Sequence, residues 1–284
     1  MNTTTIGWIG LGNMGTPMSQ RLITAGYAVA VYNRNKEKET ALQAAGASTA
    51  GTPAELMGQA SVIFTMVSDD KAIRDIFNGN EGLLKATTTG KLIINMSTVS
   101  PGISKEMAAA CEKQGHQYLD APVSGSVKQA ETGQLVIMVG GATDAFEQAT
   151  PILEHLGRLV LRVGDHGAGN MAKLAMNLLL GIYAQGLAEA TLFASTHGVR
   201  TEDFLNIFNN SALSNVFGKI KGDAILQDNY KPAFALKLIA KDLRLARTEG
   251  WKTPLAETAW QSYQQAEPGF GNQDIIAILR SLAQ

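Results

Sequence analysis

Three glycines near the amino-terminal end have the spacing of a phosphate-binding turn. The segment Gly10–Gly15 reads Gly-x-Gly-x-x-Gly and directly follows the apolar run Thr5–Ile9. In such a turn the first glycine permits a tight bend, the second lets the backbone approach a pyrophosphate, and the third lets the next helix pack closely on the strand. The alternative is a glycine turn without a ligand. Dinucleotide contacts are predicted at Gly10, Leu11, Gly12, Asn13, Met14 and Gly15.

The residues after the second apolar run indicate which nicotinamide cofactor is preferred. Ala28–Tyr32 is followed by Asn33 and Arg34, at the place where NAD-specific sites usually present Asp or Glu to the ribose hydroxyls. A guanidinium at this place can hold the 2′-phosphate of NADP through charge-assisted hydrogen bonds. Asn33 and Arg34 are therefore predicted cofactor contacts, with NADP(H) preferred and NAD(H) possible. The alternative is that Arg34 is a solvated charge beside Lys36.

Two further apolar runs end in residues that can line the same site. Val67 and Ser68 close one run, and Ser97 and Thr98 follow the next. Ligands bind at the carboxyl ends of the strands in open α/β sheets, so these four residues are predicted to contact the ribose or the nicotinamide. Ser97 or Thr98 can equally cap the helix that is expected to begin near Pro101.

Lys173 is the candidate acid–base residue. It interrupts an apolar helical pattern, and Asn177 lies four residues later on the same helix face. Reduction of a carbonyl group by hydride leaves an alkoxide that needs a proton, and a positioned ammonium group can supply it. Lys173 and Asn177 are therefore predicted to flank one substrate oxygen. The alternative is a lysine whose stem covers apolar surface while its charge stays in water.

These residues need a framework of parallel strands and crossover helices. From residue 5 to about residue 163, short apolar runs alternate with amphipathic stretches, which is typical of a doubly wound α/β sheet of the Rossmann type. The predicted strands are Thr5–Ile9, Ala28–Tyr32, Val62–Val67, Lys91–Met96, Gln117–Asp120, Leu135–Val139 and Leu159–Val163.

Beyond Gly164 the pattern predicts helices only. The apolar stretch Gly169–Ser195 contains polar interruptions, and it is predicted to be a long buried helix that is too polar to span a membrane. The sequence thus predicts a dinucleotide-binding domain, residues 1–164, and an all-helical substrate and oligomerisation domain, residues 165–284, joined by this long interdomain helix. The other predicted helices are Thr201–Asn210, Ala235–Glu249, Pro254–Ala266 and Asp274–Leu282.

The overall composition favours a small-molecule partner. The 284 residues include 24 Lys and Arg against 25 Asp and Glu, a formal net charge of −1, which offers no general attraction for nucleic acid or for an anionic membrane. The single cysteine, Cys111, excludes an internal disulfide, and the four histidines lack the spacing of metal ligands, so no metal site is expected. Residues 1–15 do not have the pattern of a signal peptide, and a cytoplasmic location is expected.

Across nearly its full length, the chain resembles the β-hydroxyacid dehydrogenase family, which includes 3-hydroxyisobutyrate dehydrogenases and tartronate or succinic semialdehyde reductases. Four motifs in the same order carry the resemblance. They are Gly10–Gly15, Asp120–Gly125, Gly167–Lys173 with Asn177, and Lys241–Leu243. Four ordered motifs are far more specific than a single glycine motif.

The resemblance implies a Rossmann domain, a helical domain, an active site between the domains, and dimers or tetramers. It implies that Lys173 is the catalytic acid–base residue and that Asn177 helps to hold the substrate. It also implies that Ser124 and Gly125 receive the substrate carboxylate, because a hydroxyl and successive N–H groups can form an anion-binding concavity. The lysine that matches Lys241 faces the cofactor in the family.

The chain departs from the family pattern at one place in the substrate loop. The family usually continues Ser-Gly-Gly, whereas this chain reads Ser124-Gly125-Ser126. If the Ser126 side chain points into the pocket, it adds a donor and an acceptor and favours a more polar acid. Ser126 is therefore a predicted substrate contact, and the alternative is that its side chain turns away.

The combined prediction is an NAD(P)-dependent oxidoreductase that acts reversibly on a small anionic hydroxyacid or aldehyde acid. Two other classes stay open. An NADPH-dependent imine reductase has a similar two-domain plan, but typically has another residue in place of the lysine, so Lys173 argues against it. A catalytically silent dinucleotide-binding interaction module is also possible, because a fold alone does not prove chemistry.

Overall fold

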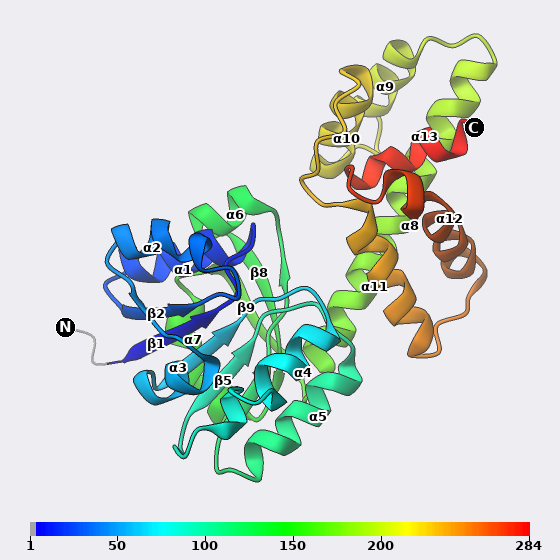
Figure 1. The fold of residues 1–284 in the computed structure, drawn as a ribbon. Helices are drawn as coiled ribbons and strands as arrows, with labels where there is room; N and C mark the ends of the chain where they lie inside the picture. The colour runs from blue at the N-terminus through cyan, green and yellow to red at the C-terminus, as the bar shows by residue number, and fades with distance from the viewer. Residues whose placement is uncertain (1–3) are drawn as a thin grey trace. The chain divides into compact units, whose positions relative to one another are not determined.

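The computed structural model describes residues 4–284 (Figure 1). By its internal contacts the chain divides into two compact units, Met1–Lys173 and Leu174–Gln284. The first three residues of the predicted first domain lie outside the described residues. The domain boundary at residue 164 stays a prediction, and the division by contacts falls inside a helix that begins at Ala168.

The first unit is built on a nine-stranded sheet. Neighbouring strands run parallel in the order β3-β2-β1-β4-β5-β6, which is the strand order of a dinucleotide-binding Rossmann fold. Beyond β6, strand β8 is antiparallel to both β6 and β7, and β9 pairs parallel with β8. The strands are β1 (Thr5–Ile9), β2 (Ala28–Tyr32), β3 (Ser48–Thr49), β4 (Val62–Thr65), β5 (Leu92–Asn95), β6 (Gln117–Asp120), β7 (Val123–Ser124), β8 (Leu135–Gly141) and β9 (Gly157–Gly164).

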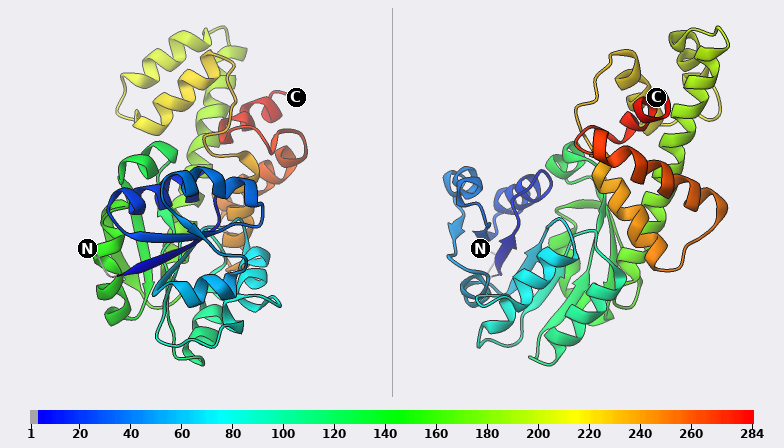
Figure 2. Two further views of the ribbon diagram at one scale, coloured as in Figure 1. Left: turned by 60° about the vertical axis from the view of Figure 1, so that its left-hand side comes forward. Right: turned by 45° about the vertical axis from the view of Figure 1, so that its right-hand side comes forward.

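Helices cover both faces of this sheet (Figure 2). Apolar residues of α1, α6 and α7 form one core cluster with the sheet, and those of α3, α4 and α5 form another. Consecutive strand residues point to opposite faces, so Phe64 joins the first cluster and Ile63 the second. The helices are α1 (Gly15–Thr24), η1 (Lys36–Glu39), α2 (Thr40–Ala44), α3 (Pro53–Gln59), α4 (Asp70–Asn78), η2 (Leu83–Lys85), α5 (Pro101–Glu112), α6 (Val127–Thr132) and α7 (Thr143–Leu153).

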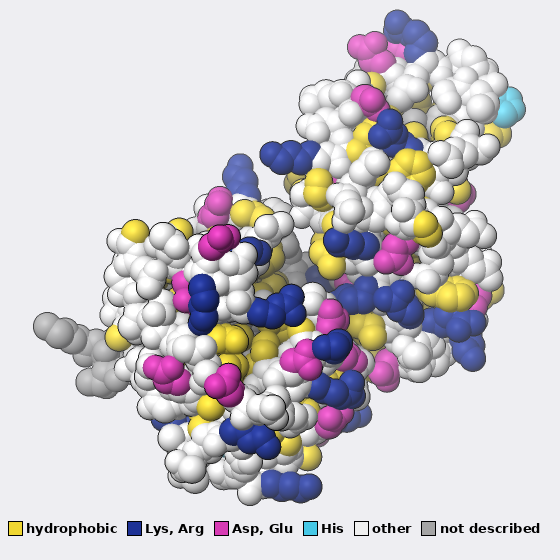
Figure 3. Space-filling model, viewed as in Figure 1, with side chains coloured by type: hydrophobic (Ala, Val, Ile, Leu, Met, Phe, Trp, Pro, Cys, Tyr) yellow, Lys and Arg dark blue, Asp and Glu magenta, His cyan; other side chains and the backbone are white. Residues whose placement is uncertain are grey.

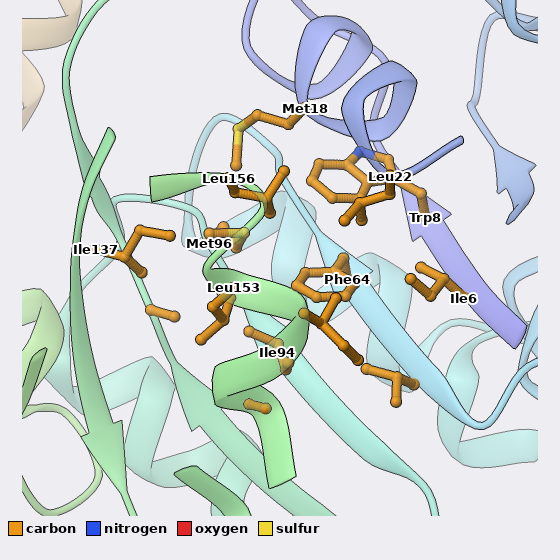
Figure 4. Packing of buried hydrophobic residues seen from close by; sticks show 14 of the residues in the cluster. Ile6, Trp8, Met18, Leu22, Phe64, Ile94, Met96, Ile137, Leu153 and Leu156 are labelled. Atoms are coloured by element: carbon orange, nitrogen blue, oxygen red, sulfur yellow. The ribbon is translucent and has the colours of Figure 1, made fainter. Parts of the chain in front are cut away.

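Two large aromatic side chains form the centre of the first cluster. Trp8 and Phe64 are fully buried, and their rings stack with centroids 5.2 Å apart (Figure 4). The indole N–H of Trp8 donates to the carbonyl of Gly10 at 3.1 Å. The core therefore fixes the start of the glycine turn as well as the two central strands.

The predicted α/β fold class is confirmed by the observed sheet and helices. All seven predicted strands are present, with boundaries within a few residues of those expected. The sequence did not predict β3 and β7, which have only two residues each, nor the antiparallel pairing of β8. Strands this short carry too little periodicity to be recognised.

The second unit is helical. Its buried apolar residues form one cluster, in which Tyr263 is fully buried and donates to the carbonyl of Gly181. The predicted helices are all present, but α10 was not expected, since Gly218 and Gly222 lower its helix propensity. The elements are α8 (Ala168–Thr196), α9 (Thr201–Asn209), α10 (Val216–Leu226), α11 (Leu236–Thr248), α12 (Pro254–Phe270), η3 (Ile275–Ala277) and α13 (Ile278–Leu282).

The long helix α8 is less buried than expected. Met176, Leu179 and Phe193 expose about half or more of their surface, with fractions of 49%, 61% and 67%. By length and composition alone, α8 is also apolar enough to cross a membrane, contrary to the prediction that it is too polar. The core helix of a soluble protein meets the same criterion.

Candidate active site

The glycine turn follows β1, the strand at which the strand order of the sheet reverses. Strand β1 has β2 on one side and β4 on the other, and ligands of open α/β sheets bind at the carboxyl ends of the strands where the strand order reverses in this way. Gly10 has a φ of +96°, and a Cβ there would lie 2.2 Å from the carbonyl oxygen of Met66. A Cβ on Gly15 would lie 1.9 Å from the carbonyl oxygen of Gly10. Both positions therefore require glycine for close backbone approach.

The turn is open above Gly12. A Cβ on Gly12 would meet nothing within 4 Å, and both Gly12 and Asn13 are exposed. Helix α1 begins at Gly15. Its N-cap residue is Met14, and within residues 4–284 no side chain accepts a capping hydrogen bond from the first N–H groups of this helix. Uncapped N–H groups at a helix start are the donors that a pyrophosphate uses. The residues of this turn therefore fit a dinucleotide.

Asn33 fixes the turn from the end of β2. Its Oδ1 accepts the N–H of Leu11 at 2.9 Å, and its own N–H donates to Oε1 of Glu39 at 2.7 Å. Glu39 is 4% exposed and also forms an ion pair with Lys36 at 3.0 Å. The side chain of Leu11 is buried in the core, so only the backbone of this predicted contact lies at the turn.

Arg34 follows Asn33 and is exposed. Within residues 4–284 its guanidinium has no ion-pair partner, whereas Lys36 is held by Glu39 and by the carbonyl of Ala50. The Lys36 ammonium also lies 4.3 Å from the centre of the Tyr32 ring. Of these two cations, Arg34 is therefore the one whose charge is available to an anion.

The loop after β5 is held in place by hydrogen bonds between buried polar groups. Ser97 is fully buried, and its Oγ accepts the N–H of Val67 at 2.9 Å. The N–H of Ser97 donates to Oδ1 of Asn95, which also accepts the hydroxyl of Thr65. Ser97 thus joins the loops after β4 and β5, which differs from the direct ligand contact expected of its side chain.

The caps of the next two helices are also resolved. Asp69 Oδ1 accepts the N–H of Ala72 at the start of α4, and the exposed Ser68 donates its hydroxyl to Asp69 at 2.7 Å. Helix α5 begins at Pro101 as expected, but Ser100 caps it, rather than Ser97 or the half-buried Thr98. The capping alternative for those two residues was wrong.

The predicted substrate loop combines a glycine of positive φ with a capped helix. Gly125 has a φ of +141°, and a Cβ there would lie 2.7 Å from Leu135. The hydroxyl of Ser126 donates to the side chain of Gln129, whose Oε1 also accepts the N–H of Ser126 at 2.9 Å. This capping box starts α6, and it corresponds to the alternative in which the Ser126 side chain turns away from the substrate. Ser124 is half-buried at the end of β7.

Lys173 lies in the second turn of α8 and is half-buried. The start of α8 is attached to the carboxyl edge of the sheet, because the side chain of Asp120, at the end of β6, accepts the N–H groups of Gly167 and Asn170. The Oδ1 of Asn170 in turn accepts the N–H of Val99, in the loop after β5. The predicted acid–base residue therefore lies close along the helix to the edge that carries the glycine turn.

The second unit contains the other two predicted site residues. Asn177 donates from Nδ2 to Oδ2 of Asp242 at 2.5 Å, and Nζ of Lys241 lies 3.1 Å from Oδ1 of the same carboxylate. Asn177 and Asp242 are each 3% exposed. The structure therefore brings Asn177 and Lys241 together through Asp242, which is not among the predicted site residues.

Two phenylalanines and the single cysteine pack into the cores of the two units. Phe217 and Phe234 are partly buried against the core of the second unit. Cys111 is fully buried, and burial raises the pKa of its thiol to about 12. Across the described residues, 4–284, no group of three or more His, Cys, Asp or Glu side chains is arranged to hold a metal ion.

Comparison with protein families identifies both halves of the chain. The family model of the NAD-binding domain of 6-phosphogluconate dehydrogenase matches residues 5–164. The model described as NAD-binding of NADP-dependent 3-hydroxyisobutyrate dehydrogenase matches residues 167–282. The sequence expectation of nicotinamide dinucleotide binding is therefore confirmed.

Curated relatives match over nearly the whole chain. Mouse mitochondrial 3-hydroxyisobutyrate dehydrogenase is 35% identical over 99% of this chain and 88% of its own. The chloroplastic glyoxylate/succinic semialdehyde reductase 2 of Arabidopsis thaliana is 32% identical over 99% of this chain and 80% of its own. Human cytokine-like nuclear factor N-PAC is 34% identical over 97% of this chain, which spans about half of that protein.

Solved structures give the same result. A Mycobacterium tuberculosis 3-hydroxyisobutyrate dehydrogenase, solved with L-serine, is 29% identical, with a TM-score of 0.89 over 99% of both chains. Psf3, solved with NADP⁺ and 2-OPP, is 26% identical, with a TM-score of 0.89 over 98% of this chain and 99% of its own. An imine reductase from Pseudomonas sp. is 24% identical, with a TM-score of 0.66 over 99% of this chain and all of its own, and shares the fold.

Proposed function

The chain belongs to the β-hydroxyacid dehydrogenase family, and on that premise we propose that it transfers a hydride reversibly between NADP(H) and a short β-hydroxyacid or its semialdehyde acid. The coarser part of this function, an NAD(P)-dependent hydroxyacid dehydrogenase, follows from the family. The observation that carries the finer part is the location of Lys173. Its helix starts at the carboxyl edge of the sheet, where it is hydrogen-bonded to Asp120 at the end of β6 and to Val99 in the loop after β5.

Lys173 has the proton-transfer role in this proposal. A nicotinamide dinucleotide held at the glycine turn would supply or accept the hydride. When the carbonyl group of the substrate is reduced, its oxygen gains a negative charge and takes a proton from Nζ of Lys173. In the oxidative direction Nζ takes that proton back from the hydroxyl group. The lysine thus holds the proton at the same substrate oxygen in both directions.

The carboxylate of the substrate meets the loop after β7 in this proposal. Gly125 is exposed and has a backbone conformation that a side chain would obstruct, so its N–H can approach an anion closely. Ser124 supplies a hydroxyl donor beside it. Ser126 shapes the loop through its capping box with Gln129, and a direct contact from its side chain would require that box to open.

Asn177 orients the substrate oxygen in this proposal. It lies one helical turn after Lys173 on α8, so both side chains point to the same side of the helix. Its amide is fixed by the charge-assisted hydrogen bond to Asp242, which limits its rotation. Lys241, held by the same carboxylate, has the role of a cofactor contact.

The proposed preference for NADP(H) is supported by the charges after β2. The carboxylate of Glu39 is buried and occupied by Asn33 and Lys36, so it does not serve as the ribose-binding acid of an NAD-specific site. Arg34 presents an exposed guanidinium in the same segment. A planar guanidinium matches a phosphate with two parallel hydrogen bonds, so Arg34 is the proposed partner of the 2′-phosphate.

The substrate class is tested by a cofactor-oxidation screen with glyoxylate, succinic semialdehyde, methylmalonate semialdehyde and tartronate semialdehyde. The reverse reaction uses the corresponding hydroxyacids and L-serine, with which one structural relative was solved. Propanal, an aldehyde without a carboxylate, is the matched control. We expect at least one aldehyde acid to be reduced with kcat/KM more than 100-fold above that of propanal. Equal rates with propanal would contradict carboxylate recognition.

A non-catalytic binding module is the second candidate. It is favoured by the similarity to N-PAC, which is named as a nuclear factor rather than as an oxidoreductase. Tight NADPH binding without turnover of any acid or alcohol in the screen would establish this alternative. Cyclic imines are included as a third arm, and their selective reduction would identify an imine reductase.

The assembly is proposed to be a cytoplasmic homodimer or homotetramer with no nucleic-acid or membrane partner. In support, Leu159 and Leu161 on the edge strand β9 are about half exposed, as is Met176 on α8. Acidic and basic side chains are interspersed on the face of the first unit that Figure 3 shows. Light scattering on the purified protein tests the proposal, and a monomer at micromolar concentration would contradict it.

A further inference from the structure

The start of α8 is bound to the sheet by a fully buried carboxylate. Asp120 is 0% exposed, its Oδ1 accepts the N–H of Gly167 at 2.7 Å, and its Oδ2 accepts the N–H of Asn170 at 2.8 Å. The two donors flank the first residues of the helix, so both carboxylate oxygens are used on the same turn. A single hydroxyl would cap one donor, whereas this carboxylate fixes both the position and the direction of the helix.

The side chain of Asn170 makes a second attachment. It is also 0% exposed, its Oδ1 accepts the N–H of Val99 at 3.0 Å, and its Nδ2 donates to Oγ of Ser104 at 3.1 Å. Val99 belongs to the loop after β5, and Ser104 to α5. The same helical turn is thus bound to β6, to the β5 loop and to α5.

There is no space for this turn to slide. A Cβ on Gly169 would lie 2.4 Å from the carbonyl oxygen of Met138 and 2.6 Å from that of Asp120. A Cβ on Gly140 would lie 2.5 Å from Oδ1 of Asp120. The helix backbone therefore rests directly on the backbone of β6 and β8, and the buried carboxylate sits in the contact.

Burial disfavours the charged form of a carboxyl group. Burial raises the pKa of Asp120, while the hydrogen bonds from Gly167 and Asn170 act in the opposite direction. Buried ionic groups add little net stability, and fixing one arrangement of the chain is their best-attested use. The burial of this carboxylate costs free energy, and in return its two hydrogen bonds fix the start of α8 on the sheet.

We propose that Asp120 and Asn170 are the positioning residues of Lys173, which lies one turn further along α8. This inference rests on the proposed function, because it takes Lys173 as the group that transfers the proton. Neither residue needs to touch the substrate. They set the distance between Nζ of Lys173 and the reacting oxygen, where a displacement of about 1 Å is enough to reduce the rate by about 100-fold.

Two variants test this proposal. Asp120→Asn keeps the size of the side chain, but its amide nitrogen cannot accept a hydrogen bond, so one of the two N–H groups of α8 loses its partner. Asn170→Ala leaves the backbone bond to Asp120 and removes the bonds to Val99 and Ser104. His116→Gln is the matched control, because it changes a buried polar residue next to the opposite end of β6.

The kinetic readout separates positioning from loss of folded enzyme. For both variants we expect kcat to fall by about 10- to 100-fold, with KM and the Kd for NADPH within twofold of the wild-type values. With cofactor deuterated at the transferred position, the isotope effect on kcat should rise, because the chemical step becomes slower. A merely unstable variant would lose active sites without a change in the isotope effect, and that result for both variants would overturn the proposal.

Amide hydrogen exchange gives a readout that does not depend on activity. In Asp120→Asn we expect residues 167–173 to exchange at least tenfold faster, while β1 and β4 exchange as in the wild type. Unchanged exchange at residues 167–173 would overturn the proposal even if turnover were reduced. An inactive wild-type protein in the substrate screen would instead count against the proposed function, since the exchange experiment still reports on the attachment of α8.

Discussion

Asn177 and Asp242 form a buried hydrogen bond of 2.5 Å between Nδ2 of the amide and Oδ2 of the carboxylate. The other oxygen of Asp242 is 3.1 Å from Nζ of Lys241. One carboxylate therefore fixes a proposed substrate contact and a proposed cofactor contact. Hydrogen bonds to charged groups contribute about 1.5–3 kcal/mol each, which is enough to hold both side chains in one rotamer.

Replacement of Asp242 should affect both ligands. Asp242→Asn removes the charge that orients Asn177 and Lys241, so we expect kcat/KM to fall by about 10- to 100-fold and the Kd for NADPH to rise. Steady-state kinetics and fluorescence titration of NADPH measure the two effects. Asp203→Asn, which changes an exposed acid paired with Arg200, is the matched control. Values within twofold of the wild type for both ligands would show that Asp242 has no such role.

Removal of Arg34 should change cofactor preference. Arg34→Ala deletes the exposed guanidinium proposed to bind the 2′-phosphate, so we expect the Kd for NADPH to rise by about 10- to 100-fold and that for NADH to change by less than twofold. Lys38→Ala, an exposed neighbouring cation, controls for a general effect of charge. Equal loss of affinity for the two cofactors would reject the assignment of Arg34 to the phosphate.

Lys173→Met should separate binding from chemistry. Methionine keeps most of the length of the side chain and loses the ammonium group, so NADPH should bind as in the wild type while kcat falls by about 100- to 10,000-fold. Stopped-flow measurement of a single turnover follows the chemical step directly. Lys219→Met, at an exposed position on α10, is expected to retain full activity. Near-normal turnover in Lys173→Met would exclude the lysine as the proton donor.

The sequence was most informative where local pattern and tertiary fold agree. The bounds of β1 and β2 were predicted to the residue, because apolar and β-branched residues end at a glycine turn after β1 and at a polar segment after β2. The alternative that Ser97 or Thr98 caps the next helix was wrong, because Ser100 caps it, while the Ser97 side chain is held by Val67 in the loop after β4. A contact between residues 30 positions apart leaves no periodic signal in one sequence.

One feature of the site could have been predicted from the sequence, and another could not. The Ser-x-x-Gln spacing at Ser126 and Gln129 is the signature of a capping box, so the orientation of the Ser126 side chain could have been inferred from the sequence. The bonds from Asp120 to Gly167 and Asn170 span about 50 residues and depend on how β6 and α8 meet. Only the folded chain shows that partnership.

His116 should make the stability of the first unit depend on pH. It is 3% exposed, and its Nδ1 accepts the N–H of Lys91 at 3.2 Å. Burial, and then the charge of Lys91, lower the pKa of His116, so the ring stays neutral to a lower pH in the folded protein than in the unfolded chain. The unfolded chain takes up a proton near pH 6.5 and the folded chain only at lower pH. The contribution of His116 to folding stability is therefore fully present above about pH 6.5 and decreases as the pH falls below that value.

The variant His116→Gln isolates this effect, because glutamine keeps an acceptor for the N–H of Lys91 but cannot be protonated. Urea unfolding at fixed ionic strength between pH 8 and pH 5 measures the free energy of unfolding of both proteins. We expect the wild type to be the more stable at pH 8 and its advantage to shrink steadily as the pH is lowered. A pH-independent difference between the wild type and His116→Gln would show that the imidazole titrates alike in the folded and unfolded states.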